Sequence, residues 1–224
     1  MLLDPYKRPV NYLRVSVTDR CDFRCQYCMS ENMKFLPKKD LLSLEEIERI
    51  CISFVELGTK KIRITGGEPL VRKGVMGLFK NLGSLLSNGQ LKELTLTSNG
   101  SQLERFADEL YGYGVRRINV SIDTLNPKLF HELTRRGDLE KVKRGIDKAL
   151  KVGLKVKINT VALKETNENE LINIMNWAHS KGCDITFIET MPLGEIDVDR
   201  TDQFLPLSKV KEMFSKHYKL SPSK

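Results

Sequence analysis

The 224 residues are enough for one large domain or two small ones, and an apolar fraction of 40% is enough to build a core. Charged residues make up 29% of the chain and no Pro, Gly/Ser or Gln/Asn tract occurs, which excludes disordered and fibrous classes. No apolar run approaches the roughly 18 residues that span a bilayer. Asp4 and Pro5 interrupt the position where a signal peptide would need an apolar stretch. We therefore expect a soluble, cytoplasmic protein without a membrane partner.

The formal net charge of +8 favours anionic partners, which include nucleic acids, nucleotides and phosphorylated metabolites. No basic run is longer than a pair, such as Arg116-Arg117 or Arg135-Arg136. A dedicated nucleic-acid-binding tail would need longer clusters of Lys and Arg. We therefore do not expect nucleic acid as the partner.

Short β-type runs alternate with longer helical patterns along the chain. Ser43 and Glu46 form the sequence pattern of a capping box at a helix start. Gly58, Gly114 and Gly153 each stand where a helix would end before the next strand, as does Gly182. This repeated order predicts parallel strands joined by right-handed crossovers, in a single α/β domain over residues 1–224. In chain order, we expect strands at 13–17, 61–65, 93–97, 117–122, 155–162 and 185–189, and helices at 43–57, 75–86, 102–113, 138–152 and 169–180.

Five of these six strands alternate polar and apolar residues, although buried parallel strands are usually apolar throughout. A polar face shared by five strands favours a partial (β/α)6 TIM-like barrel with a wet, concave interior and helices over the apolar face. Two alternatives to this barrel are an open doubly wound sheet and a sheet whose polar face simply meets solvent. The polar face carries Arg14, Ser16, Thr18, Arg63, Thr65, Thr95, Thr97, Asn99, Asn119, Ser121, Asp123, Lys157 and Asn159.

Three of the five cysteines, Cys21, Cys25 and Cys28, lie within eight residues, directly after the first predicted strand. Cys51 and Cys183 lie far from them, and we expect both to be buried structural residues. An odd cysteine count without a secretion signal argues against a disulfide framework. Tetrahedral zinc would need a fourth ligand, whereas a [4Fe–4S] cluster held by three thiolates leaves one iron open. A surface thiol cluster and an incomplete zinc site are the less specific interpretations.

A second motif, ITGGEP at residues 64–69, ends the second predicted strand. Its two glycines allow the backbone to approach a ligand closely, and Glu68 could accept a hydrogen bond from an ammonium group. Such a run could by itself be an ordinary turn. Its position one strand–helix unit after the cysteines favours a binding role.

The CxxxCxxC and GGEP motifs together resemble those of the radical S-adenosylmethionine (SAM) enzymes. Within that class, the sequence is similar to the GTP 3′,8-cyclase family of molybdenum cofactor (molybdopterin) biosynthesis, and the similarity runs from about residue 6 to the end. It rests on NYLRVSVTDRC (11–21), KIRITGGEP (61–69), TSNG (97–100), RINVSID (117–123) and FIETM (187–191).

The resemblance implies a barrel of the radical SAM type and a lyase. A 5′-deoxyadenosyl radical would convert GTP into (8S)-3′,8-cyclo-7,8-dihydroguanosine 5′-triphosphate. It also implies a reductant such as flavodoxin or ferredoxin, the pathway partner cyclic pyranopterin monophosphate synthase, and a homodimer. By position, Cys21, Cys25 and Cys28 would hold one [4Fe–4S] cluster, Tyr27, Gly67, Ser121 and Met191 would bind SAM, and Arg14, Lys61, Arg63, Thr97 and Lys157 would face GTP.

The sequence departs from that family in two ways. The family carries a C-terminal segment with a second cysteine triad for a second [4Fe–4S] cluster, and no such triad follows here. We therefore expect a truncated chain or a fragment. Thr186 stands where many members have Arg, which would remove one phosphate donor.

Two rival functions remain open at this stage. The first is a radical SAM enzyme acting on a peptide or another metabolite. The second is a non-catalytic nucleotide-binding module, whose cysteines hold zinc or nothing.

Overall fold

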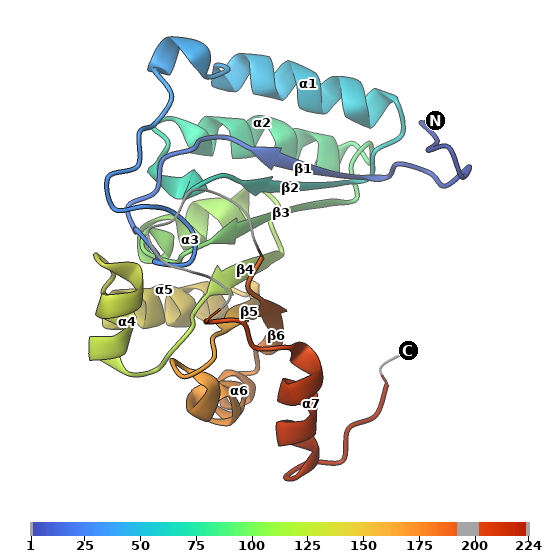
Figure 1. Cartoon of the computed structure of the whole chain (residues 1–224). Helices are drawn as coiled ribbons and strands as arrows, with labels where there is room; N and C mark the ends of the chain where they lie inside the picture. The colour runs from blue at the N-terminus through green and yellow to red at the C-terminus, as the bar shows by residue number, and fades with distance from the viewer. Residues whose placement is uncertain (1, 192–201, 223–224) are drawn as a thin grey trace. The chain divides into compact units, whose positions relative to one another are not determined.

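The computed structural model describes residues 2–191 and 202–222. Six strands form one sheet in the order β1-β2-β3-β4-β5-β6, and helices alternate with them along the chain (Figure 1). The strands are β1 (Tyr12–Ser16), β2 (Lys61–Thr65), β3 (Glu93–Ser98), β4 (Arg117–Ser121), β5 (Lys155–Ala162) and β6 (Asp184–Glu189). The helices are α1 (Leu44–Glu56), α2 (Val75–Ser87), α3 (Leu103–Gly112), α4 (Pro127–Thr134), α5 (Leu139–Lys151), α6 (Leu171–Ser180) and α7 (Leu207–Ser215). Short 3-10 helices lie at Lys38–Asp40, Pro69–Val71 and Glu168–Glu170.

The six strands and five helices predicted from the sequence are all present, which confirms the α/β class. The predicted capping box of α1 is also formed, because Ser43 N donates to Glu46 Oε2 at 2.7 Å and Glu46 N donates to Ser43 Oγ at 3.1 Å. The sequence analysis missed α4 and α7. A local signal for α4 does exist: Asn126 caps it by accepting from Lys128 N, and proline occupies its first turn.

Contacts within the chain divide it into two compact units. Unit 1 comprises Met1–Phe23, Lys34–Val120 and Glu140–Val156, and unit 2 comprises Arg24–Met33, Ser121–Leu139 and Lys157–Lys224. Compactness alone does not make a unit an independently folding domain, so the expectation of a single domain stays a prediction. Among the described residues, no helix combines the length and the apolar character that crossing a membrane would require.

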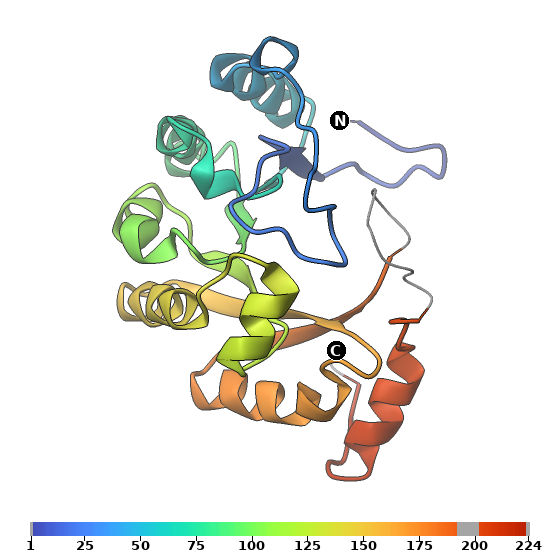
Figure 2. The same cartoon turned by 60° about the vertical axis from the view of Figure 1, so that its left-hand side comes forward.

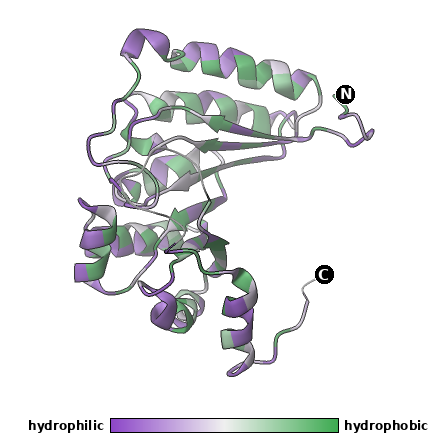
Figure 3. Cartoon of the chain, in the orientation of Figure 1, coloured by the Kyte–Doolittle hydropathy of each residue, from purple (hydrophilic) through white to green (hydrophobic). Residues whose placement is uncertain are grey.

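In unit 1, the strands separate an apolar face from a polar one. Helices α1, α2 and α3 lie on one side of β1–β3 (Figure 2), and hydrophobic and hydrophilic residues alternate along α1 (Figure 3). Parallel pairing places Arg14 opposite Arg63 and Arg63 opposite Thr95. The polar side chains of these three strands therefore share one face, as the alternation predicts. The apolar side chains Ile62, Ile64, Leu94, Leu96, Ile118 and Val120 are buried.

Unit 2 has its own hydrophobic cluster. Helix α7 follows β6 in the chain, and Phe214 of α7 packs its ring 5.1 Å from the ring of Phe187 in β6. Six buried residues from the end of β5, from α6, from α7 and from the segment before α7 form this cluster: Ala162, Leu171, Ile174, Leu205, Val210 and Phe214.

The turn after β2 packs directly against the segment that leads from β1 to the cysteines. A Cβ atom on Gly67 would lie 2.3 Å from the carbonyl oxygen of Arg20, and one on Gly66 would lie 2.6 Å from that of Thr18. The backbone closes this contact, because Gly67 N donates to Thr18 O at 2.7 Å and Glu68 N donates to Arg20 O at 2.8 Å. Only glycine allows two backbones to approach this closely.

The Glu68 side chain continues this connection towards β3. It is fully buried, and its carboxylate accepts hydrogen bonds from Leu70 N at 2.9 Å, Ser98 Oγ at 3.0 Å and Asn99 N at 2.6 Å. Burial raises the pKa of this carboxyl from 4.5 to about 7, although the hydrogen bonds from Asn99 and Leu70 oppose the shift. Glu68 therefore joins the loop after β2 to the loop after β3.

Two glycines of α2 provide a matched test of helix packing. A Cβ on Gly83 would lie 2.2 Å from Tyr113 O, at the C-terminal end of α3, whereas a Cβ on Gly77 meets nothing within 4 Å. We expect Gly83→Ala to lower the free energy of unfolding by roughly 1–3 kcal/mol through overpacking. Gly77→Ala should raise it by about 0.5–1 kcal/mol, because it restricts the unfolded chain. Urea unfolding measures both, and a stabilised Gly83→Ala chain would contradict the close approach.

The buried Glu68 predicts a pH-dependent stability. Between about pH 4.5 and 7, the folded chain holds a proton on Glu68 that the unfolded chain has lost. The free energy of unfolding should therefore fall as the pH rises through this window, by on the order of 3 kcal/mol at most. Glu68→Gln should flatten this slope in urea unfolding series, while Glu56→Gln, on the exposed end of α1, should leave it unchanged. Equal slopes for Glu68→Gln and the parent chain would contradict this assignment.

Candidate functional site

The three clustered cysteines are divided between the two units. Cys21 belongs to unit 1, and Cys25 and Cys28 belong to unit 2, where Cys28 N donates to Cys25 O at 2.9 Å in a tight turn. Within residues 2–191 and 202–222, no three or more His, Cys, Asp or Glu side chains are gathered as a metal ion would require. The fit of these residues to an iron–sulfur cluster therefore rests on the chemistry of the donors, three thiols within one eight-residue loop.

Cys21 lies beside a polar network at the end of β3. Its Sγ is 3.6 Å from Asn99 Nδ2, and the same amide nitrogen donates to Asp22 Oδ1 at 2.7 Å. Ser101 Oγ donates to the other oxygen of Asp22 at 2.5 Å. Burial raises the pKa of the Cys21 thiol to about 12, which favours the neutral thiol until a metal replaces its proton.

The cysteine turn of unit 2 packs on α4, one of the helices that the sequence analysis missed. Gln26 N donates to Leu133 O at 2.9 Å, and Gln26 Nε2 donates to Glu132 O at 2.9 Å. Arg24 N donates to Thr134 O at 2.9 Å. The backbone on both sides of Cys25 is thus fixed by the C-terminal turn of α4.

Tyr27 connects this turn to the residues that follow β4. Its hydroxyl donates to Asp123 Oδ2 at 2.5 Å, while Val161 N donates to Asp123 Oδ1 at 2.8 Å. Burial raises the pKa of Asp123 to about 6, although both hydrogen bonds oppose the shift, and burial also raises the pKa of Tyr27. Asn167 Nδ2 donates to Asp123 O at 2.7 Å. The sequence analysis placed Asp123 on the polar face without assigning it a ligand, and it assigned no role to Asn167.

A cavity of about 360 Å³ in unit 2 brings together two of the residues that the resemblance assigns to SAM, Tyr27 and Met191. Met191 is 58% exposed, so it is not a core residue. The hydroxyl oxygen of Thr190 is buried beside it without a hydrogen-bond partner among the described residues. Ser121 is half-buried at the end of β4 in the same unit, and Gly67 lies in the turn after β2 of unit 1. The cavity is lined by Tyr27, Cys28, Val161, Ile188, Glu189, Thr190 and Met191.

The polar face of unit 1 carries three of the residues that the resemblance assigns to GTP. Arg14 and Arg63 are neighbours across β1 and β2, and neither forms an ion pair within the described part of the chain. The guanidinium of Arg63 lies 5.9 Å from the centre of the Tyr12 ring, and its Nε atom is buried without a hydrogen-bond partner there. Thr97 Oγ1 is likewise buried and unpartnered. Lys157, another of the five residues that the resemblance assigns to GTP, is half-buried in unit 2.

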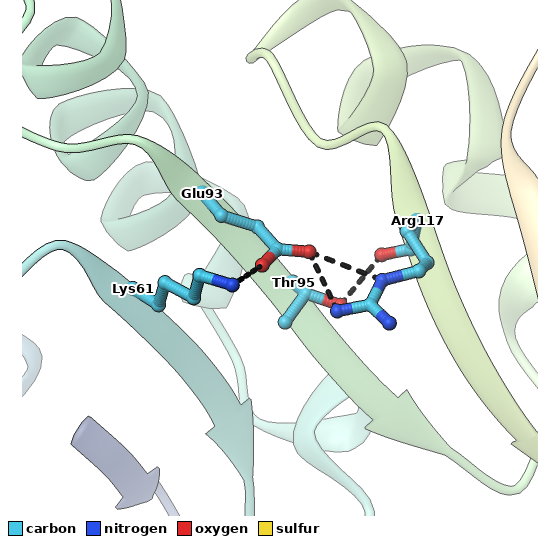
Figure 4. Close-up of polar contacts among 4 residues, drawn as sticks. All are labelled: Lys61, Glu93, Thr95 and Arg117. Atoms are coloured by element: carbon cyan, nitrogen blue, oxygen red, sulfur yellow. Dashed lines mark hydrogen bonds and ion pairs between the residues drawn. The ribbon is translucent and has the colours of Figure 1, made fainter. Parts of the chain in front are cut away.

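Lys61, in contrast, is ion-paired at the start of β2 (Figure 4). Its Nζ lies 3.7 Å from Glu93 Oε2, and Arg117 donates from Nε and one terminal nitrogen to Glu93 Oε1 at 3.0 and 2.7 Å. Thr95 Oγ1 donates to Arg117 O at 2.6 Å. Lys61, Glu93 and Arg117 are the first residues of their strands. The cations of this network are thus already paired at the N-terminal edge of the polar face, whereas sites in such folds lie at the carboxyl ends of the strands.

The sequence pattern of the radical SAM superfamily matches residues 15–178. A GTP 3′,8-cyclase of Brucella canis (strain ATCC 23365 / NCTC 10854 / RM-666) is 60% identical over 220 residues, which are 98% of this chain and 64% of that protein. A GTP 3′,8-cyclase of Rhizobium leguminosarum bv. trifolii (strain WSM2304) is 61% identical over 98% of this chain and 63% of that protein. The chain thus spans slightly less than two thirds of the length of these relatives.

Solved structures show a similar fold. Streptococcus suis SuiB bound to S-adenosylmethionine matches with a TM-score of 0.70 and 20% identity, over 92% of this chain and 47% of that one. Native anSMEcpe with bound AdoMet matches with a TM-score of 0.70 and 20% identity, over 92% of this chain and 60% of that one. Together with the six-stranded parallel sheet, these matches confirm a partial TIM-like α/β fold. Since the superfamily pattern covers well over half of its length, the chain belongs to the radical SAM superfamily.

Proposed function

We propose that this chain is a GTP 3′,8-cyclase that uses SAM to join C3′ of the ribose of GTP to C8 of its guanine. The proposal draws on the 60% identity to proteins of that name over 98% of the chain. The observation that carries it is the pair of neighbouring arginines, Arg14 and Arg63, together with the unpartnered hydroxyl of Thr97 on β3. A triphosphate is the kind of ligand that such a face would accept.

Membership of the radical SAM superfamily implies two cofactors, a [4Fe–4S] cluster and SAM. When bound, these two cofactors would supply a 5′-deoxyadenosyl radical, because one electron from the cluster cleaves the sulfonium of SAM and releases methionine. The chain's own residues would contribute the thiolates of Cys21, Cys25 and Cys28. Tyr27 and Met191 would bind SAM at the cavity of unit 2, and the resemblance assigns Ser121 and Gly67 to the same ligand.

Arg14 and Arg63 would bind the phosphates of GTP on the polar face of unit 1. Two unpaired guanidinium groups on neighbouring strands repel each other, and a polyphosphate between them would remove that repulsion and stabilise the folded chain. The Nε–H of Arg63 and the hydroxyl of Thr97 would gain the hydrogen-bond partners that they lack. Lys157, which the resemblance also assigns to GTP, lies in unit 2. The ion-paired Lys61 would contribute less than these residues.

The direct test of the proposed function is anaerobic incubation of the reconstituted chain with GTP, SAM and dithionite, followed by mass detection of the cyclised nucleotide. The rival radical SAM function, acting on a peptide or another metabolite, predicts SAM cleavage that GTP does not affect. The rival non-catalytic module predicts nucleotide binding without iron or sulfide. A reductant such as flavodoxin or ferredoxin, cyclic pyranopterin monophosphate synthase as pathway partner, a homodimer and a cytoplasmic location all stay predictions.

The cluster assignment predicts a selective cysteine dependence. Anaerobic reconstitution should give about four irons per chain, since one cluster needs three thiolates and no other thiols are grouped. Cys21→Ala should abolish iron binding, whereas Cys51→Ala and Cys183→Ala, at buried structural positions, should retain it. Iron and sulfide analysis measures the outcome. About eight irons per chain, or loss of the cluster in Cys183→Ala, would contradict the assignment.

The substrate assignment predicts that phosphate binding depends on the polar face. Arg63→Met should weaken GTP binding by roughly 10- to 100-fold, the effect expected when a charge-assisted hydrogen bond is lost. Inorganic tripolyphosphate should compete with GTP, and added salt should weaken both ligands. Arg144→Met is the matched control, because Arg144 pairs with Glu104 at 3.3 Å on the helical side of unit 1. Isothermal titration calorimetry measures these affinities, and equal affinities of Arg63→Met and the parent chain would exclude this site.

A further inference from the structure

The side chain of Asn99 contacts the first cysteine of the cluster motif from a loop 78 residues further along the chain. Its Nδ2 lies 3.6 Å from Cys21 Sγ and 2.7 Å from Asp22 Oδ1. An amide nitrogen carries two hydrogens, so one can point to the carboxylate while the other points to the sulfur. Both partners belong to unit 1.

Three further contacts fix the orientation of this amide. Asn99 Oδ1 accepts from Ser101 N at 2.9 Å, which directs Nδ2 towards Cys21 and Asp22. The backbone of Asn99 is held by Glu68, whose buried carboxylate accepts from Asn99 N at 2.6 Å. Ser101 Oγ holds the far oxygen of Asp22 at 2.5 Å. The amide is thus fixed beside the sulfur before any cluster is bound.

We propose that Asn99 is a positioning residue, whose amide N–H donates to the Cys21 sulfur and raises the reduction potential of the cluster that this cysteine binds. The inference rests on the proposed cluster ligation by Cys21. A hydrogen bond to a thiolate sulfur withdraws negative charge, and it therefore stabilises the reduced, more negative state of the cluster over the oxidised one. Asn99 acts through Cys21 and need not touch the substrate.

A purely structural role for Asn99 makes a different prediction. If the amide only closes the turn with Asp22 and Ser101, its replacement changes stability but not the electronic state of a bound cluster. The two roles are therefore separated by a measurement on the cluster itself. The midpoint potential is such a measurement, and it requires neither SAM nor GTP.

The experiment is an EPR-monitored redox titration of the reconstituted 224-residue chain without SAM. Two variants remove the donor: Asn99→Leu has a similar shape, and Asn99→Asp keeps the oxygen that accepts from Ser101 N. At the parent chain's midpoint potential, the ratio of reduced to oxidised cluster should fall roughly three- to tenfold in Asn99→Leu, the effect of one lost hydrogen bond. It should fall further in Asn99→Asp, which adds a negative charge. Ser101→Ala is the control, because it removes a bond to Asp22 and leaves the contact with Cys21.

A lower midpoint potential in both Asn99 variants, with the Ser101→Ala value close to that of the parent chain, supports the proposal. Unchanged potentials in the Asn99 variants overturn it. An equal shift in Ser101→Ala also overturns it, because the effect would then come from Asp22. Failure of both Asn99 variants to hold about four irons counts against it as well, since Asn99 would then be a structural requirement. The titration contains neither SAM nor GTP, so a chain that fails to bind or cyclise GTP would still give these potentials. Failure of the proposed function can therefore be told apart from failure of this inference.

Discussion

The candidate site depends on one close contact between two backbone segments. One segment is the turn after β2, and the other leads from β1 to Cys21. Gly67 lies against Arg20 so closely that a single added carbon would collide with the carbonyl group. Two backbone hydrogen bonds then fix residues 18–20 immediately before Cys21. Since Glu68 follows at once and is bound by the loop after β3, three successive loops of unit 1 are connected through one turn.

This turn has a different role from the one that its residue types first indicate. The sequence suggests that the Glu68 carboxylate accepts from an ammonium group, yet three donors of the chain itself already bind it in the buried interior. A buried carboxylate without partners would be costly, and these hydrogen bonds offset part of that cost. Glu68 orders Asn99, and Asn99 reaches Cys21. Any effect of Glu68 on cofactor binding can therefore pass through the loop after β3.

Charge is distributed unevenly over the polar face of unit 1. At the N-terminal edge, Glu93 forms ion pairs with both Lys61 and Arg117 (Figure 4). Arg63 lies further along β2, beside Arg14, without an acidic partner in the described residues. The same face thus has an edge whose cations are already ion-paired and an adjacent region, around Arg14 and Arg63, whose cations have no acidic partner in the described residues. An anion should therefore bind more favourably at Arg14 and Arg63 than at the ion-paired edge.

The sequence by itself determined the order of the six strands and of the helices α1, α2, α3, α5 and α6, the capping box of α1, the polar face and both motifs. These features follow from short-range rules, namely the two-residue period of strands, the preferences of Ser and Gly at helix ends, and cysteine spacing. Only the tertiary structure decided that Asp123 binds Tyr27, that α4 supports the cysteine turn, and that Asn99 meets Cys21. Each of these contacts joins residues 78 to 106 positions apart. Local periodicity carries no information about such pairs, because their meeting depends on how strands align and how loops pack at the sheet edge.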